Sequence, residues 1–121
     1  AADRYVRASY YITAIPQTDD TRIAVAGAFS VIRQCSVPYG ISTEGFPNLS
    51  TTRWRTVSDQ KNLVYYFEDA LSPNAIWVDL KKLDFSKTAK VKKLALDKNQ
   101  IYAGETSKQF VETKPFIFQG I

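Results

Sequence analysis

The chain has 121 residues, 45% hydrophobic and 13% aromatic, which is enough apolar material to bury a core and to exclude a disordered chain. Sixteen Lys and Arg against 12 Asp and Glu give a net charge of +4, and no run approaches the roughly 20 apolar residues of a membrane-spanning helix. A single cysteine excludes an intrachain disulfide, and the length predicts one unit over residues 1–121.

The first predicted element is a helix from Asp3 to about Ile15. Apolar side chains recur there close to the helical spacing. They are Tyr5, Ala8, Ile12 and Ile15. Pro16 ends the run, because proline cannot continue a helix interior. No targeting signal is visible before this helix and the chain starts at Ala1 without a Met, so we expect a processed chain or a piece of a longer one.

A second helix is predicted from about Ile23 to about Cys35. Asp19, Asp20 and Thr21 precede it and offer the side-chain oxygens that cap helix N-termini. Its apolar face consists of Val25, Ala28, Phe29 and Ile32. This face should pack against another element.

A β-hairpin is predicted next, after an irregular loop at residues 37–48 that contains two Pro and two Gly. Residues 52–58 and 63–68 are rich in β-branched and aromatic side chains. Four residues join them, Asp59, Gln60, Lys61 and Asn62, which suits a hairpin connection.

A third strand at residues 75–80 follows the turn residues Ser72, Pro73 and Asn74, so we expect an antiparallel meander. Aromatic side chains fall on both faces of this sheet, whereas a sheet covered on one side alternates cleanly between apolar and polar. The sequence therefore predicts a sheet covered on both faces and an α+β fold of two helices followed by an antiparallel β-meander.

The last third of the chain has a weaker pattern, with short strands predicted around residues 91–96 and 115–118. It carries the positive excess, in lysines that alternate with apolar residues. These lysines are Lys81, Lys82, Lys87, Lys90, Lys92 and Lys93. We interpret them as a solvated surface and expect no nucleic-acid partner, although binding through this cluster would be a third interpretation, with affinity falling steeply with salt.

The inventory of reactive residues is short. With no histidine and one cysteine, the chain by itself excludes Ser-His-Asp and Cys-His mechanisms, His-ligated metals and cysteine-rich zinc sites. The glycines are too widely spaced for a phosphate-binding loop. We therefore expect no metal or cofactor, and we interpret Cys35 as a packed small hydrophobe.

Two arginines, Arg53 and Arg55, lie two residues apart in the first hairpin strand and hence on one face. They could bind a carboxylate. The competing interpretation is that they pair with acidic groups of the sheet, namely Asp59, Glu68 or Asp79. Trp54 and Trp77 are predicted to lie in the core.

Several blocks of the sequence, in the same order, resemble the choloylglycine hydrolase family, which includes bile salt hydrolases and penicillin V acylases. The blocks are residues 3–8, 29–32, 36–40, 52–59, 64–68 and 77–85, with the hairpin sequence Thr52-Arg53-Trp54-Arg55-Thr56-Val57-Ser58-Asp59 the most informative. The chain is most similar to penicillin V acylase-like members from Gram-negative bacteria.

The resemblance implies a four-layer αββα fold, of which this chain would supply the C-terminal portion. In the family an N-terminal cysteine attacks the amide carbonyl, its own α-amino group acts as base, and water hydrolyses the acyl-enzyme. This chain begins at Ala1 and should be inactive without the upstream portion. The segment Asp3-Arg4-Tyr5-Val6-Arg7 matches the family's pattern around an active-site arginine, so Arg4 is the one candidate catalytic residue.

The same resemblance implies the partners. We expect the upstream portion of the hydrolase, a small amide substrate, assembly into homotetramers and no membrane partner. Penicillin V, conjugated bile salts and N-acyl homoserine lactones remain open as substrates, with penicillin V first. Export to the periplasm is implied by the Gram-negative members, with the cytoplasm as the alternative. The alternative to a hydrolase portion is a non-catalytic α+β binding or interaction module derived from this family.

Overall fold

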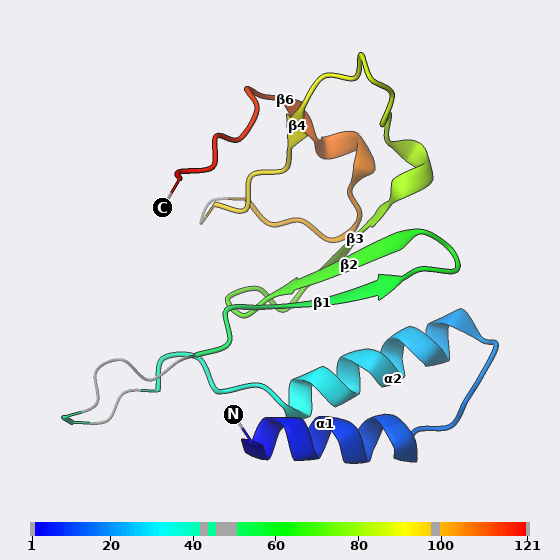
Figure 1. Ribbon diagram of the computed structural model, residues 1–121, viewed down its shortest axis with the longest axis vertical. Helices are drawn as coiled ribbons and strands as arrows, with labels where there is room; N and C mark the ends of the chain where they lie inside the picture. The colour runs from blue at the N-terminus through cyan, green and yellow to red at the C-terminus, as the bar shows by residue number, and fades with distance from the viewer. Residues whose placement is uncertain (1, 42–43, 46–50, 98–99, 121) are drawn as a thin grey trace.

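The computed structural model describes the chain apart from residues 1, 42–43, 46–50, 98–99 and 121. Figure 1 shows a pair of helices, α1 (Ala2–Ala14) and α2 (Thr21–Gln34), lying along one side of a sheet. Short C-terminal elements lie on the side of the sheet away from the helices. The predicted α+β class is confirmed, whereas the loop predicted at residues 37–48 lies partly outside the described residues.

The two helices begin and end within about two residues of their predicted bounds. Asp20 caps α2, its Oδ1 accepting from the backbone N–H of Arg22 at 2.8 Å and of Ile23 at 3.3 Å. Arg7 of α1 donates from Nη1 to the carbonyl of Gln34 at 2.8 Å, which ties the first helix to the end of the second. No residue of α1 is buried, whereas Phe29 and Val31 of α2 are.

The predicted meander is confirmed and extended by a fourth strand. Strands β1 (Trp54–Asp59), β2 (Val64–Asp69) and β3 (Ala75–Asp79) pair antiparallel in that order. Strand β5 (Gly104–Glu105) then pairs with β3 in parallel. The sheet is therefore mixed, and the chain between β3 and β5 makes the crossover connection that a parallel neighbour requires.

Asp59 and Asn62 organise the hairpin turn. Asp59 Oδ1 accepts from the Asn62 N–H at 3.0 Å and Oδ2 accepts from Asn62 Nδ2 at 2.7 Å. These hydrogen bonds lower the pKa of the Asp59 carboxyl. Asn62 Nδ2 also donates to Thr21 Oγ1 at 3.3 Å. The turn is thereby joined to the start of α2.

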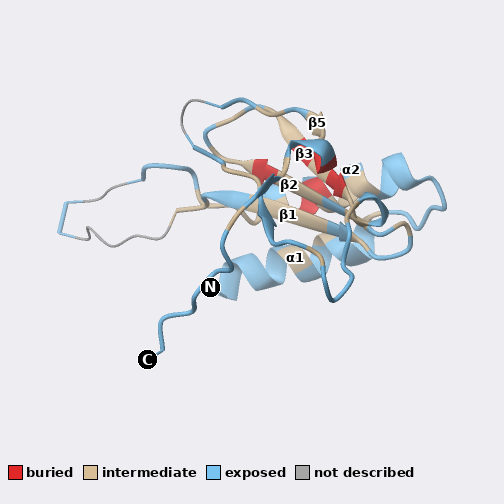
Figure 2. Ribbon diagram, turned by 90° about the horizontal axis from the view of Figure 1, so that it is seen from above, coloured by how far each residue is buried: buried red, intermediate tan, exposed pale blue. Residues whose placement is uncertain are grey.

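Alternate residues of the meander face opposite sides, and the two sides are covered unequally. On the α2 side the Phe29 and Tyr66 rings meet edge-on, with centroids 6.2 Å apart. On the other side Ile76 and Val78 of β3 are buried, but Trp54 of β1 is 58% exposed and Tyr65 of β2 is 40% exposed. Figure 2 shows the buried residues on α2, on the central strands and directly after β5, with α1 exposed. Within the described residues, the expected cover on both faces is thus incomplete.

The C-terminal third forms less sheet than expected. Strand β4 (Lys92–Lys93) pairs antiparallel with β6 (Val111–Glu112), so the strand predicted at residues 91–96 is short, and the one predicted at residues 115–118 is wrong. The segment 104–107 is anchored by Glu105, which accepts hydrogen bonds from Ser107 and the Asp79 N–H and lies 3.3 Å from Lys82 Nζ. With the Ser107 hydroxyl as the largest cause, the pKa of Glu105 is lowered to about 2. Lys90 pairs with Glu112 at 2.9 Å.

No helix in the described part of the chain is both long and apolar enough to cross a membrane. Its described residues also contain no cluster of three potential metal-ligating Cys, Asp or Glu side chains.

Candidate active-site groove

A groove of about 460 Å³ opens where the start of α1, the end of α2 and the start of β1 meet. Its walls carry guanidinium, hydroxyl and thiol groups. It is lined by Arg4, Ile32, Cys35, Ser36, Thr51, Thr52, Arg53, Trp54, Arg55 and Thr56. The fold thus brings the candidate catalytic residue Arg4 together with the candidate carboxylate-binding pair Arg53 and Arg55.

Hydrogen bonds between two stretches far apart in the chain hold the groove in shape. The Thr52 N–H donates to the carbonyl of Val37 at 3.2 Å, and the Val37 N–H donates to Thr52 Oγ1 at 2.9 Å. Thr51 Oγ1 donates to the Pro38 carbonyl at 2.9 Å. The segment that leads into β1 is therefore fixed against the segment that leaves α2.

Arg55 belongs to an ion-pair cluster at the base of the groove. Its Nη1 lies 3.3 Å from Glu68 Oε2, and its Nε donates to Ser36 Oγ at 2.7 Å. Arg33 donates to the same carboxylate, from Nη2 to Oε1 at 2.5 Å. These contacts, that of Arg33 above all, lower the pKa of the nearly buried Glu68 carboxyl, even though desolvation alone would raise it. For Arg55, pairing with Glu68 was the correct interpretation.

Arg4 and Arg53 differ from Arg55, because neither guanidinium has a hydrogen-bond or ion-pair partner among the described residues. Both side chains are exposed in the groove. No acidic side chain of the described part lines the groove, so its surface favours an anion or a developing negative charge.

Two sequence predictions change in this setting. Trp54 is not a core residue here, since it is 58% exposed and lines the groove, whereas Trp77 is half-buried against Tyr66 with ring centroids 6.0 Å apart. Cys35 is half-buried and contributes to the groove wall instead of packing fully inside. Sequence reasoning also missed Ser36, whose place in a Ser-Val-Pro-Tyr-Gly block directly after the helix was its only signal.

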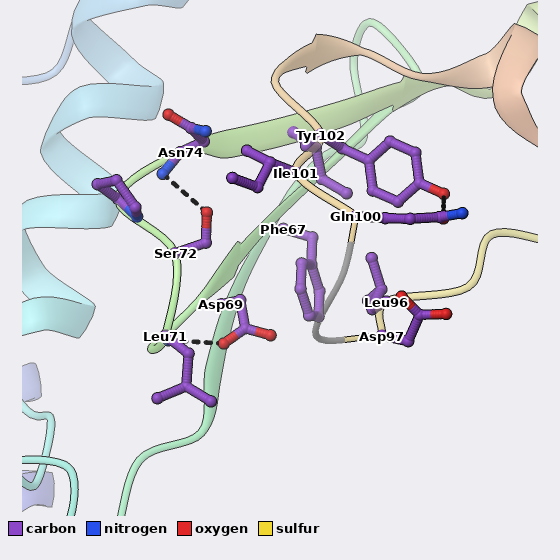
Figure 3. Close-up of a pocket in the computed structure, with 12 residues that line it drawn as sticks. Phe67, Asp69, Leu71, Ser72, Asn74, Leu96, Asp97, Gln100, Ile101 and Tyr102 are labelled. Carbon is purple, nitrogen blue, oxygen red and sulfur yellow. Dashed lines mark hydrogen bonds between the residues drawn. The ribbon is translucent and has the colours of Figure 1, made fainter.

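A second hollow, of about 390 Å³, lies on the opposite side of the sheet. Figure 3 shows Phe67 at its centre, with Leu96, Ile101 and Tyr102 from the crossover segment around it. Its rim carries the Asp69 carboxylate, which accepts from the Leu71 N–H at 2.7 Å. This hollow contains none of the candidate site residues.

Residues 1–100 match the family model described as linear amide C–N hydrolases, choloylglycine hydrolase family. The chain belongs to this family. It is 46% identical to a penicillin V acylase of Pectobacterium atrosepticum over an alignment that covers the whole of this chain and 36% of that protein. The solved structure of penicillin V acylase from Agrobacterium tumefaciens superposes with a TM-score of 0.91 at 52% identity, covering all of this chain and 39% of that one. The chain thus corresponds to rather more than a third of a penicillin V acylase-like linear amide C–N hydrolase.

Proposed function

We propose that this chain is the C-terminal part of a cysteine N-terminal-nucleophile amidase that hydrolyses linear amide C–N bonds, with penicillin V-type amides as its substrates. The family match and two relatives named penicillin V acylase support the reaction class and the substrate. Conjugated bile salts and N-acyl homoserine lactones are the other substrates of this chemistry. The catalytic cysteine comes from the upstream portion.

The observation that carries this proposal is the free guanidinium of Arg4 in a groove without acidic lining residues in the described part. A cation there favours the thiolate form of the upstream cysteine. When the thiolate attacks the amide carbonyl, its carbon–oxygen π electrons move to the oxygen, and Arg4 stabilises this charge. The C–N bond then breaks, the amine leaves with a proton, and water hydrolyses the thioester.

Exposed apolar surface supports the need for an upstream portion. The chain exposes 10000 Å² to solvent, against about 6,600 Å² expected for a compact monomer of its mass. Tyr5 and Tyr10 of α1 are among the exposed side chains, at 75% and 67%. We propose that the upstream portion covers the face of the sheet that bears Trp54 and Tyr65, as the second sheet of a four-layer αββα fold.

The same surface argues against a self-standing, non-catalytic α+β module. Such a module would unfold cooperatively as residues 1–121 alone and would expose no large apolar face. We expect the isolated chain to self-associate instead. Export to the periplasm and assembly into tetramers stay predictions from the family resemblance.

The test is substitution of Arg4 in the full-length enzyme. Arg4→Gln should lower kcat for penicillin V about 100-fold to 1,000-fold, the usual cost of losing one donor to a developing oxyanion. Arg4→Lys should retain part of the activity, because it keeps the charge but loses the planar fork. The matched control is Arg22→Gln, since the Arg22 side chain is 91% exposed and lies outside the groove. Equal activities of the Arg4→Gln and Arg22→Gln enzymes would exclude the proposed role.

A further inference from the structure

The groove carries more positive charge than its own chain compensates. Arg4, Arg53 and Arg55 line it, and Arg33 lies directly behind Arg55. The one carboxylate paired with this group among the described residues is Glu68, and it is shared between Arg33 and Arg55. The charges of Arg4 and Arg53 are left for groups that enter the groove from outside.

Arg53 has a fixed backbone, and its guanidinium has no hydrogen-bond or ion-pair partner among the described residues. Its carbonyl accepts from the Ala70 N–H at 2.9 Å, which extends the β1–β2 ladder by one step. Thr52, just before it, is held to Val37 by two hydrogen bonds. The guanidinium is thus presented from a rigid base, on the same strand face as Arg55, and it can bind an anion with little loss of backbone entropy.

We propose that Arg53 is a specificity-determining residue that binds a carboxylate on the leaving-amine side of the amide substrate. This inference rests on the proposed function, in which Arg4 lies beside the scissile amide. Penicillin V carries its single carboxylate on the bicyclic amine that hydrolysis releases, while its acyl part is neutral. The groove volume is in the range of small-molecule sites.

A carboxylate is the anion that suits this position best. A guanidinium presents two parallel N–H donors that match the two oxygens of a carboxylate. The groove separates two tasks, with Arg4 at the reacting carbonyl and Arg53 at the distal anion. The enzyme should therefore prefer amides whose amine part carries a carboxylate over neutral analogues of the same shape.

The experiment compares penicillin V with its methyl ester in the full-length enzyme and in the Arg53→Gln, Arg53→Lys and Arg22→Gln variants. Arg53→Gln should lower kcat/KM for penicillin V by about tenfold to 100-fold, the range of a hydrogen bond between charged groups. The loss should appear as a higher KM for penicillin V. For the methyl ester, kcat/KM of Arg53→Gln should stay within about twofold of the wild-type value. Arg53→Lys should recover part of the preference, and Arg22→Gln should match the wild type.

An equal loss on both substrates, or no loss on either, would overturn the inference, since Arg53 would then serve structure or another part of the protein. Thermal unfolding of each variant separates misfolding from lost recognition, with Arg53→Lys as the variant that keeps the charge. Calorimetric binding of 6-aminopenicillanic acid separates this inference from the proposed function. If the wild type binds this amine, Arg53→Gln weakens that binding and neither substrate is hydrolysed, the proposed function is refuted. The carboxylate site at Arg53 would still stand.

Discussion

The two faces of the β1–β3 meander are built from alternate residues of the same strands, yet the chain completes only one of them. On the α2 face, Phe29 is buried against Tyr66, and Glu68 pairs with arginines from both the helix and the sheet. On the opposite face, Trp54 and Tyr65 remain exposed beside the buried Ile76 and Val78. The chain thus contains its own outer layer for one face. The other face carries apolar side chains typical of a core, but the described residues cover it only in part.

The largest difference between the faces should appear on removing Phe29. Phe29→Ala should lower the free energy of unfolding by about 3 kcal/mol, because it deletes a buried ring and leaves a cavity. Phe85→Ala is the matched control, since Phe85 is 72% exposed, and it should change stability by less than about 0.5 kcal/mol. Urea unfolding of the full-length protein measures both. Equal effects would show that the α2 face is not the core.

A smaller loss is expected for the charged cluster on the same face. Glu68→Gln leaves Arg33 and Arg55 without their carboxylate and should cost about 2 kcal/mol. Both arginines contribute to this loss, and solvent reduces the contribution of Arg33 more, because its side chain is 50% exposed against 20% for Arg55. Glu112→Gln is the control, since the pair of Glu112 with Lys90 is exposed. It should change the free energy of unfolding by less than about 0.5 kcal/mol.

The same variant predicts a pH dependence of stability. The folded-state pKa of Glu68 is below its ordinary 4.5, so the unfolded chain binds the proton more readily. The stabilisation is therefore fully present above pH 4.5 and is lost as the pH falls through the lower folded value. Acid should destabilise the wild type more steeply than Glu68→Gln. Both proteins should still lose, on acidification, the stabilisation contributed by Glu105, whose pKa is about 2. Parallel acid curves for the two proteins would contradict this.

The smallest effect is expected on the opposite face. Trp54→Ser should raise the concentration at which the isolated chain aggregates, because Trp54 is 58% exposed. In the full-length protein the same change should lower the unfolding midpoint. Light scattering of the isolated chain measures its aggregation, and calorimetry of the full-length protein measures the unfolding midpoint. No destabilisation of the whole protein would contradict the proposal that an upstream portion covers this face.

Prediction from sequence succeeded where the pattern was local and long enough to be periodic. The helices at Ala2–Ala14 and Thr21–Gln34 and the three hairpin strands follow from apolar spacing, the Asp20 cap and the turn after Asp59. It failed for β5, because two residues carry no periodicity and their parallel pairing depends on a distant crossover. The strand expected at residues 115–118 failed for the converse reason, since strand-forming residues without a paired neighbour do not make a sheet.

The sequence by itself determined the α+β class, the order of the main elements and the family, because periodicity, caps and turn chemistry depend on near neighbours. Only the tertiary structure decided which arginines have no partner among the described residues. Arg53 and Arg55 are equivalent in the strand pattern, but helix α2 docks where Glu68 meets Arg33 and Arg55, and this leaves Arg53 in the groove with Arg4. Ion pairing depends on distances between segments far apart in the chain, which no local pattern encodes.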